Sequence, residues 1–136
     1  MRVRNFMLAE AIAGRDGYHV IHGAGFTGLN VQRFPYTHQK VSLYVTLVRE
    51  AQDTAGGHRL QVELLDPDLN KLEALADGQI ELPSEPDGDD PLLITYVGQC
   101  AGIGFPRQGI YSITLSVDGV ELDRMTIAVG DHTKEA

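Results

Sequence analysis

The chain has 136 residues, of which 43% are hydrophobic, and this is the size of one ordinary domain that can bury a core without disulfides or metals. Its formal net charge of −8 opposes binding to nucleic acids and to anionic membranes, so neither is expected as a partner. Cys100 is the only cysteine, which excludes an internal disulfide and favours a cytoplasmic location.

The first segment resembles a signal peptide only superficially. Glu10 interrupts the apolar stretch 6–9, which is shorter than the roughly 7–15 residues that a signal requires, so a cleaved leader is not expected. No apolar run approaches the ~18 residues of a membrane span. Residues 6–13 are compatible with two structures, because their alanines favour a helix while the spacing of their larger apolar residues also suits a strand.

Three glycines, Gly23, Gly25 and Gly28, have the G-x-G-x-x-G spacing of a dinucleotide-binding loop. Such a loop leads into a helix whose first amides hold the pyrophosphate. Here Pro35 would break a helix within two turns, and Phe34 before it is restricted to extended backbone. We therefore expect no cofactor, and we assign these glycines to a strand bend, a bulge or a close approach between backbones.

Alternation of apolar and polar residues predicts half-buried strands along most of the chain. The turn at 14–17 makes the following segment the second arm of a hairpin. Near the C-terminus, Asp118 and Gly119 supply the positive-φ residues of a tight hairpin, and a change of phase around 123–124 indicates a bulge. The other predicted strands cover residues 41–47, 60–64, 92–97, 110–117 and 120–129.

Polar segments between these strands are predicted to be loops and turns. Residues 72–76 contain good helix formers but are too few for a stable helix. We predict a domain over residues 1–130, followed by a frayed tail at 131–136. The predicted loops and turns cover residues 52–57, 66–71, 77–78, 84–91 and 106–109.

Two candidate chemistries are weak. Cys100 could serve a cysteine hydrolase only if a histidine lay beside it, and a small buried thiol in a strand is the simpler interpretation. His19 and His22 are three residues apart, so on a strand they point to opposite faces and do not share a metal. The sequence therefore assigns no catalytic residue, no cofactor-binding residue and no metal ligand, and the protein is not expected to be an enzyme.

A ligand-binding module for calcium or a carbohydrate is the main alternative. Asp66 and Asp68 place carboxylates at alternate positions, as a calcium loop does, but Lys71 occupies the position where such a loop needs glycine. Asp87, Asp89 and Asp90 could add oxygen ligands from a second loop, while the absence of tryptophan weakens a sugar-stacking site. Phe34 and Tyr36 flank Pro35 and are the predicted protein-contact residues, although the same segment could instead cover an edge of the core.

The order of these features resembles a small bacterial all-β family of uncharacterised function. The resemblance implies an immunoglobulin-like sandwich and a strand in the first segment, and it implies no activity. The sequence departs from the family pattern at 67–70, where an Asp-Gly turn is replaced. The matching segments are 6–11, 17–18, 22–26, 34–35, 58–66, 109–111 and 117–119.

Taken together, the sequence predicts an all-β fold, a single-domain antiparallel β-sandwich of immunoglobulin-like type. Because no convergent catalytic set is recognisable, the expected function is a non-catalytic protein-interaction or structural module. Such a module binds a protein partner or associates with itself, for example as a component of a phage or virion particle.

Overall fold

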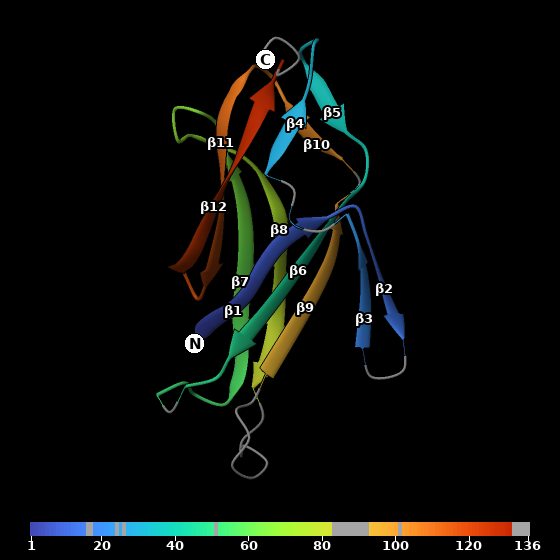
Figure 1. The fold of residues 1–136 in the computed structure, drawn as a ribbon. Coiled ribbons are helices and arrows are strands. Elements are labelled where there is room, and N and C mark those ends of the chain that lie inside the picture. Colours follow the sequence, from blue (N-terminus) through green and yellow to red (C-terminus); the bar gives the residue numbers. More distant parts are fainter. Residues whose placement is uncertain are drawn as a thin grey trace.

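Strand follows strand along the chain in the computed structural model, which describes residues 1–15, 18–23, 25, 27–50, 52–82, 93–100 and 102–131 (Figure 1). All regular elements in these ranges are β-strands, which confirms the predicted all-β fold. The strands are β1 (Arg2–Ala9), β2 (Ala11–Arg15), β3 (Tyr18–His22), β4 (Gly28–Asn30), β5 (Tyr36–His38), β6 (Val41–Val48), β7 (Gly56–Leu65), β8 (Lys71–Leu82), β9 (Leu93–Cys100), β10 (Ile103–Phe105), β11 (Gly109–Val117) and β12 (Val120–Gly130).

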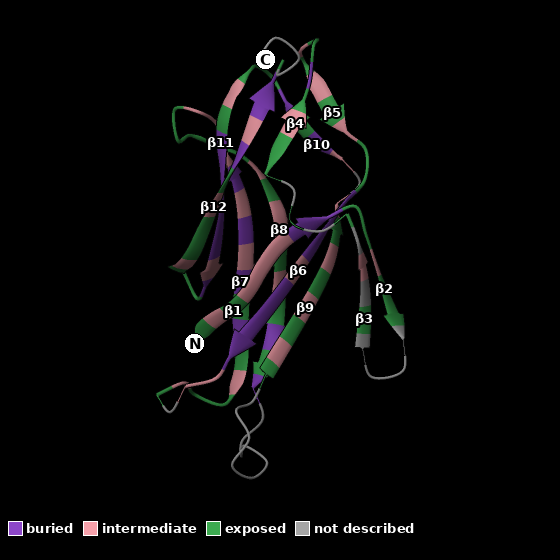
Figure 2. Ribbon diagram, viewed as in Figure 1, coloured by how far each residue is buried: buried purple, intermediate pink, exposed green. Residues whose placement is uncertain are grey.

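Two larger sheets pack face to face as a sandwich (Figure 1). One sheet is antiparallel and has the order β1-β6-β9, while the other has the order β4-β12-β11-β7-β8 and contains a single parallel pair, β4 with β12. Strands β2 and β3 form a separate hairpin, and β5 pairs with β10. The buried side chains of both larger sheets meet in one core, and Figure 2 colours the buried residues of the strands purple, most continuously along β6.

The burial of β11 confirms the apolar half of its predicted alternation, although Ser112 and Thr114 on the other face are also buried, at 6% exposure each. Tyr111, Ile113 and Leu115 are fully buried and belong to the core, as the sequence pattern predicts. Burial of a side chain of this size stabilises a fold by about 1.5–3 kcal/mol. The row of apolar side chains on β11 therefore anchors the middle of the five-stranded sheet between β7 and β12.

β6 is more buried than its alternating pattern predicts. Ser42 and Thr46, expected on the solvent side, are only 3% and 5% exposed. The reason is that β6 is the central strand of its sheet, with β1 and β9 beside it and β2 in contact with it. Asn5 satisfies the buried Thr46 hydroxyl through a hydrogen bond from Nδ2 to Oγ1 of 2.9 Å.

The hairpin between β11 and β12 is confirmed. Asp118 and Gly119 both have positive φ, 51° and 81°, as a tight two-residue turn requires. The pairing register shifts where Leu115 faces Asp123 and Ser116 faces Glu121, so Leu122 is the extra residue of the predicted bulge. The predicted bulge position was therefore off by one residue.

The turn predicted at residues 77–78 is wrong. β8 continues through Asp77 and Gly78, which pair with Gln61 and Leu60 of β7. Arg59 of β7 holds Asp77 in place by two hydrogen bonds of 2.7 and 2.9 Å, and the Tyr96 ring packs over Gly78. Residues 72–76 also belong to β8, and β7 begins at Gly56, inside the polar loop predicted at 52–57.

The structure shows the conformation of residues 6–13 and of the glycine loop that follows β3. Residues 6–9 lie in β1 and residues 11–13 in β2, with a bend at Glu10 between them, which confirms the strand that the family resemblance implied. The glycine loop leads into the short strand β4 and not into a helix, in agreement with the sequence argument. Gly23 and Gly25 have positive φ, and the amide of Gly25 donates to the Leu8 carbonyl at 2.8 Å, so these two glycines serve a bend and a close backbone approach.

The Tyr111 side chain is bonded to the backbone of the loop that precedes β11. Its hydroxyl donates to the Arg107 carbonyl and accepts a 3.2 Å hydrogen bond from the Arg107 amide. A tyrosine bonded to backbone a few residues upstream is a feature of immunoglobulin-like sandwiches, called the tyrosine corner. The architecture is thus compatible with the expected immunoglobulin-like sandwich. Of the predicted tail at 131–136, residues 132–136 lie outside the described residues.

Candidate functional site

The outer edge of β9 is the first candidate site. β9 pairs with β6 without a register shift, from Leu93 opposite Val48 to Cys100 opposite Val41, and no strand in the described ranges pairs with its other side. An edge strand of this kind presents free backbone N–H and C=O groups to a partner. Its sequence LITYVGQC contains no charged residue and no proline. We call this strand with its free side the β9 edge.

The other edge strands of the two larger sheets carry features that discourage strand addition. β8 has register shifts and charged residues, including Lys71 and Asp77. β1 has a register shift between Val3 and Asn5 and carries Arg2. β4 is only three residues long. The β9 edge is therefore the one long edge of these four without a bulge or a charge.

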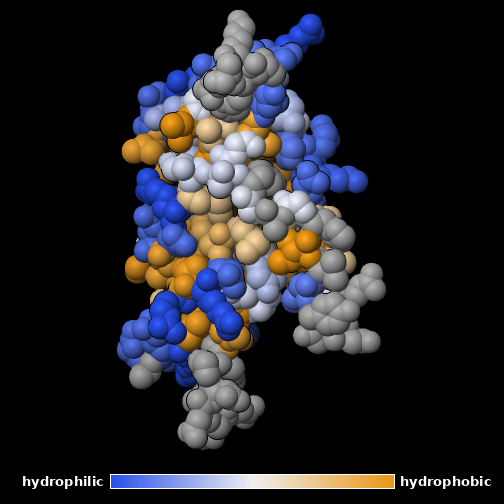
Figure 3. Space-filling view, viewed as in Figure 1, coloured by the Kyte–Doolittle hydropathy of each residue, from blue (hydrophilic) through white to orange (hydrophobic). Residues whose placement is uncertain are grey.

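Two apolar side chains on β9 point away from the core. Leu93 and Val97 are 43% and 39% exposed, while the intervening Ile94 and Tyr96 pack against the core. In the sheet, Val97 lies beside Tyr44 of β6, which in turn lies beside Met7 of β1. Figure 3, viewed from the side of this sheet, shows weakly apolar and weakly polar residues in the middle of this face.

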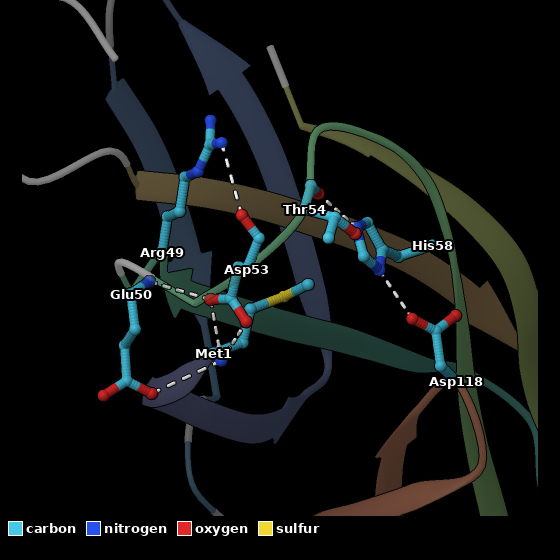
Figure 4. A network of polar contacts seen from close by, with 7 residues as sticks. All are labelled: Met1, Arg49, Glu50, Asp53, Thr54, His58 and Asp118. Carbon is cyan, nitrogen blue, oxygen red and sulfur yellow. Dashed lines mark hydrogen bonds and ion pairs between the residues drawn. The ribbon is translucent and has the colours of Figure 1, made fainter. Parts of the chain in front are cut away.

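The second candidate site is a polar cluster at one end of the sandwich (Figure 4). His58 at the start of β7 is 9% exposed and contacts Asp118 Oδ2 through Nδ1 at 2.5 Å and the Thr54 carbonyl through Nε2 at 2.7 Å. Asp118 Oδ1 also accepts from the Arg59 amide at 2.9 Å. The cluster therefore links the β6–β7 loop, the start of β7 and the β11–β12 turn.

Asp53 organises the loop part of this cluster. Its carboxylate accepts hydrogen bonds from the Met1 amino group at 2.8 Å and from the Glu50 amide at 2.7 Å. Arg49 Nη2 donates to the Asp53 carbonyl at 3.4 Å. A hollow of about 310 Å³ lies against the cluster, lined by Met1, Gln52, Asp53, Thr54, His58, Val117, Asp118, Val120 and Leu122.

The charges of the cluster support one another. The Thr54 carbonyl and the Asp118 carboxylate raise the pKa of His58 above its ordinary value of 6.5. The Arg59 amide and the His58 ring lower the pKa of Asp118. Burial opposes ionisation of Asp53, but hydrogen bonds from the Met1 amino group and the Glu50 amide outweigh it and lower the pKa of Asp53. The sequence does not predict this cluster, because His58 and Asp118 are 60 residues apart. Asp118 is the one member that the sequence singles out, as the aspartate of the predicted Asp-Gly turn.

Cys100, the candidate nucleophile, ends β9 and is half-buried. Its thiol donates to the Leu75 carbonyl at 3.3 Å, and burial raises the pKa of the thiol. A thiol with a raised pKa is a weak nucleophile at neutral pH. It borders a groove of about 660 Å³ whose other lining residues include Glu10, Lys40, Ser42 and Gln99.

The candidate calcium residues of the β7–β8 turn have structural contacts. Asp66 Oδ1 accepts from the amides of Asp68 and Asn70, each at 2.9 Å, which stabilises the predicted turn. Asp68 forms an ion pair of 2.7 Å with Arg107. Asp87, Asp89 and Asp90 lie outside the described residues. Within the described ranges, no three histidine, cysteine or acidic residues lie close enough together to hold a metal.

The histidine pair and the predicted contact residues can also be placed. His19 and His22 lie on β3, and the His19 ring packs edge-on against Tyr44 at 5.7 Å. Phe34 and Tyr36 are half-buried and pack against the core, where the Tyr36 ring stacks on Phe105 at 6.5 Å. These two aromatics thus cover an edge of the core, as the alternative interpretation proposed, and a protein contact by them stays a prediction.

The fold described above defines the class of the protein, a small all-β sandwich. A family model described as "Family of unknown function (DUF6941)" matches residues 4–130, and the chain belongs to this family. The match confirms the resemblance to an uncharacterised all-β family. No curated protein matches the chain. No helix in the described part of the chain is long and apolar enough to cross a membrane.

Among solved structures, the chain is similar to a β-glucosidase from Listeria innocua. Crystal structures of that protein with isofagomine, with glucose and without a named ligand give TM-scores of 0.51, 0.51 and 0.50. In each, 15% of residues are identical, and the match covers 93% of this chain but only 16% of the β-glucosidase chain. At this identity the similarity shows the fold alone.

Proposed function

We propose that the protein is a non-catalytic interaction module, which binds a protein partner by adding an extended segment of that partner to the β9 edge. The β9 edge carries this proposal, because it is eight residues long and has neither charge, proline nor bulge. Strand addition of this kind uses backbone hydrogen bonds for affinity and alternate side chains for specificity. Thr95 and Val97 on the outer face would contact every second side chain of the partner segment.

The remaining chemistry supports a binding role over catalysis. The Cys100 thiol is held in its protonated form, and Asp66 and Asp68 are engaged in a turn and an ion pair. We place the protein in the cytoplasm on the basis of its single cysteine. One form of this function is membership of a larger assembly, such as a phage or virion particle. Strand addition suits such a role, because a strand shared between two chains fixes their relative orientation.

Val97→Lys tests the proposal. A lysine on an edge strand opposes strand addition, because its charge must be desolvated when another strand packs beside it. The variant should lose the stoichiometric partner that remains with the wild-type protein when both are purified from native lysate. Size exclusion with mass detection measures this loss. The free energy of unfolding, measured by thermal unfolding, should change by no more than about 0.5 kcal/mol.

Ile110→Lys is the matched control. Ile110 is also exposed, at 62%, but it lies on β11, an inner strand of the other sheet. This variant should keep the partner at wild-type stoichiometry. Equal retention in both variants, equal loss in both, or a wild-type protein that purifies as a partner-free monomer would each overturn the proposal.

A further inference from the structure

The contacts of the His58 ring fix its protonation state. Both ring nitrogens face groups that can only accept hydrogen bonds, the carboxylate of Asp118 and the carbonyl of Thr54. A neutral imidazole has a single N–H, so it can serve only one of these two acceptors. Both contacts together therefore require the imidazolium form.

We propose that His58 is a pH-dependent latch that holds the β6–β7 loop against the β11–β12 turn at this end of the sandwich. In the closed form, Nε2 donates to the Thr54 carbonyl and Nδ1 donates to Asp118. When the ring loses a proton, the hydrogen bond to the charged carboxylate is the stronger of the two and is retained. The Thr54 carbonyl then faces a nitrogen lone pair, and the loop is released.

The groups around His58 favour this order of events. From the loop, the negative charge of Asp53 acts on the ring, while its carboxylate accepts hydrogen bonds from the Met1 amino group and the Glu50 amide. From the turn, Asp118 accepts a hydrogen bond from the Arg59 amide as well as from the ring. The turn therefore keeps its contact with Arg59 in both protonation states of His58.

Among the described residues, Asp118 and Asp53 are the two whose charges act on the ring. From β8, the register partner of His58 is the apolar Ile80, while Val117, Val120 and Leu122 line the adjacent hollow of about 310 Å³. The side chain of Arg59 is paired with Asp77 on β8. Release of the loop therefore changes the part of the hollow that Gln52, Asp53 and Thr54 line, which is the structural consequence of the latch.

The latch also predicts the direction of the pH effect on stability. Because folding raises the pKa of His58, its contribution is fully present below 6.5, the ordinary value. The contribution is lost as the pH rises through the pKa of the folded protein. Asp118 remains ionised throughout this range, since its pKa is lowered.

Nuclear magnetic resonance of the labelled full chain between pH 5 and 9 tests the latch. We expect His58 to titrate with a midpoint above 6.5, with Nε2 losing the proton, and the Thr54 carbonyl carbon to shift with the same midpoint. Asp118→Asn keeps the shape of the turn residue and should lower the His58 midpoint. His58→Gln should remove the pH-dependent shift of Thr54, whereas the control His38→Gln should leave it unchanged.

The outcomes that overturn the latch are distinct from a folding defect. A His58 midpoint at or below 6.5 would contradict the doubly bonded ring, and so would a neutral form that keeps Nε2–H. A Thr54 carbonyl that does not follow the His58 midpoint would contradict release of the loop. If His58→Gln does not fold, the wild-type and Asp118→Asn titrations still decide the question.

Discussion

Replacing Gly109 with alanine is expected to lower the free energy of unfolding by about 2–4 kcal/mol. Gly109 opens β11 with a φ of +154°, in a region that L side chains rarely adopt. A Cβ atom there would lie 2.5 Å from Cγ and 3.2 Å from Cβ of Pro67. Because the proline ring is rigid, only a backbone shift of β11 or of the β7–β8 turn could relieve the contact.

Gly104→Ala is the matched control for this substitution. A Cβ atom at Gly104 would meet nothing within 4 Å, and its φ lies outside the region that favours glycine. The expected change in unfolding free energy is within about 0.5 kcal/mol. Urea denaturation measures both variants side by side. Equal stability of the two variants would contradict the close approach of Gly109 to Pro67.

Tyr111→Phe is expected to cost roughly 1–3 kcal/mol of unfolding free energy, although it removes only one oxygen atom. The aromatic ring is fully buried and packs edge-on against Phe105 at 5.0 Å, so the phenylalanine ring keeps its packing. The lost hydroxyl leaves the amide and the carbonyl of Arg107 without their partner in the loop before β11. Thermal and urea unfolding should both report the loss.

Tyr36→Phe provides the comparison for the hydroxyl. The Tyr36 hydroxyl contacts His38 Nδ1 at 2.8 Å, but the residue is only half-buried, so water can replace the contact. A cost below about 1 kcal/mol is expected. If Tyr36→Phe costs as much as Tyr111→Phe, the hydroxyl of Tyr111 has no special role in closing the β11 loop.

Two Asp-Gly pairs show how far the sequence defines the fold. The pair at 118–119 lies between two alternating segments that pair with each other, and it forms the predicted turn with positive φ at both residues. The pair at 77–78 has the same local preference but lies within strand β8. There Arg59 of β7 donates a hydrogen bond to Asp77, and the Tyr96 ring lies close to Gly78. Local propensity therefore gives way where a neighbouring strand supplies partners.

The candidate sites were harder to predict than the strands for the same reason. Alternation predicted most of β9, but only the sheet order shows that β9 is an edge and that β6 is central. The contact between His58 and Asp118 joins residues 60 apart, which a reading of short motifs cannot find. Predictions from local pattern succeeded for β11 and β12, where the partner strand follows directly in the sequence.

The most direct test of the account is hydrogen exchange of the β9 amides in the native assembly and in the isolated chain. The account predicts slower exchange for residues 93–100 in the assembly, because a partner strand would bond the free N–H groups of the β9 edge. The bulged and charged edge strands β1 and β8 should exchange at the same rate in both samples. Unchanged exchange along β9, with protection at another edge or at none, would contradict the proposal that this protein works by strand addition.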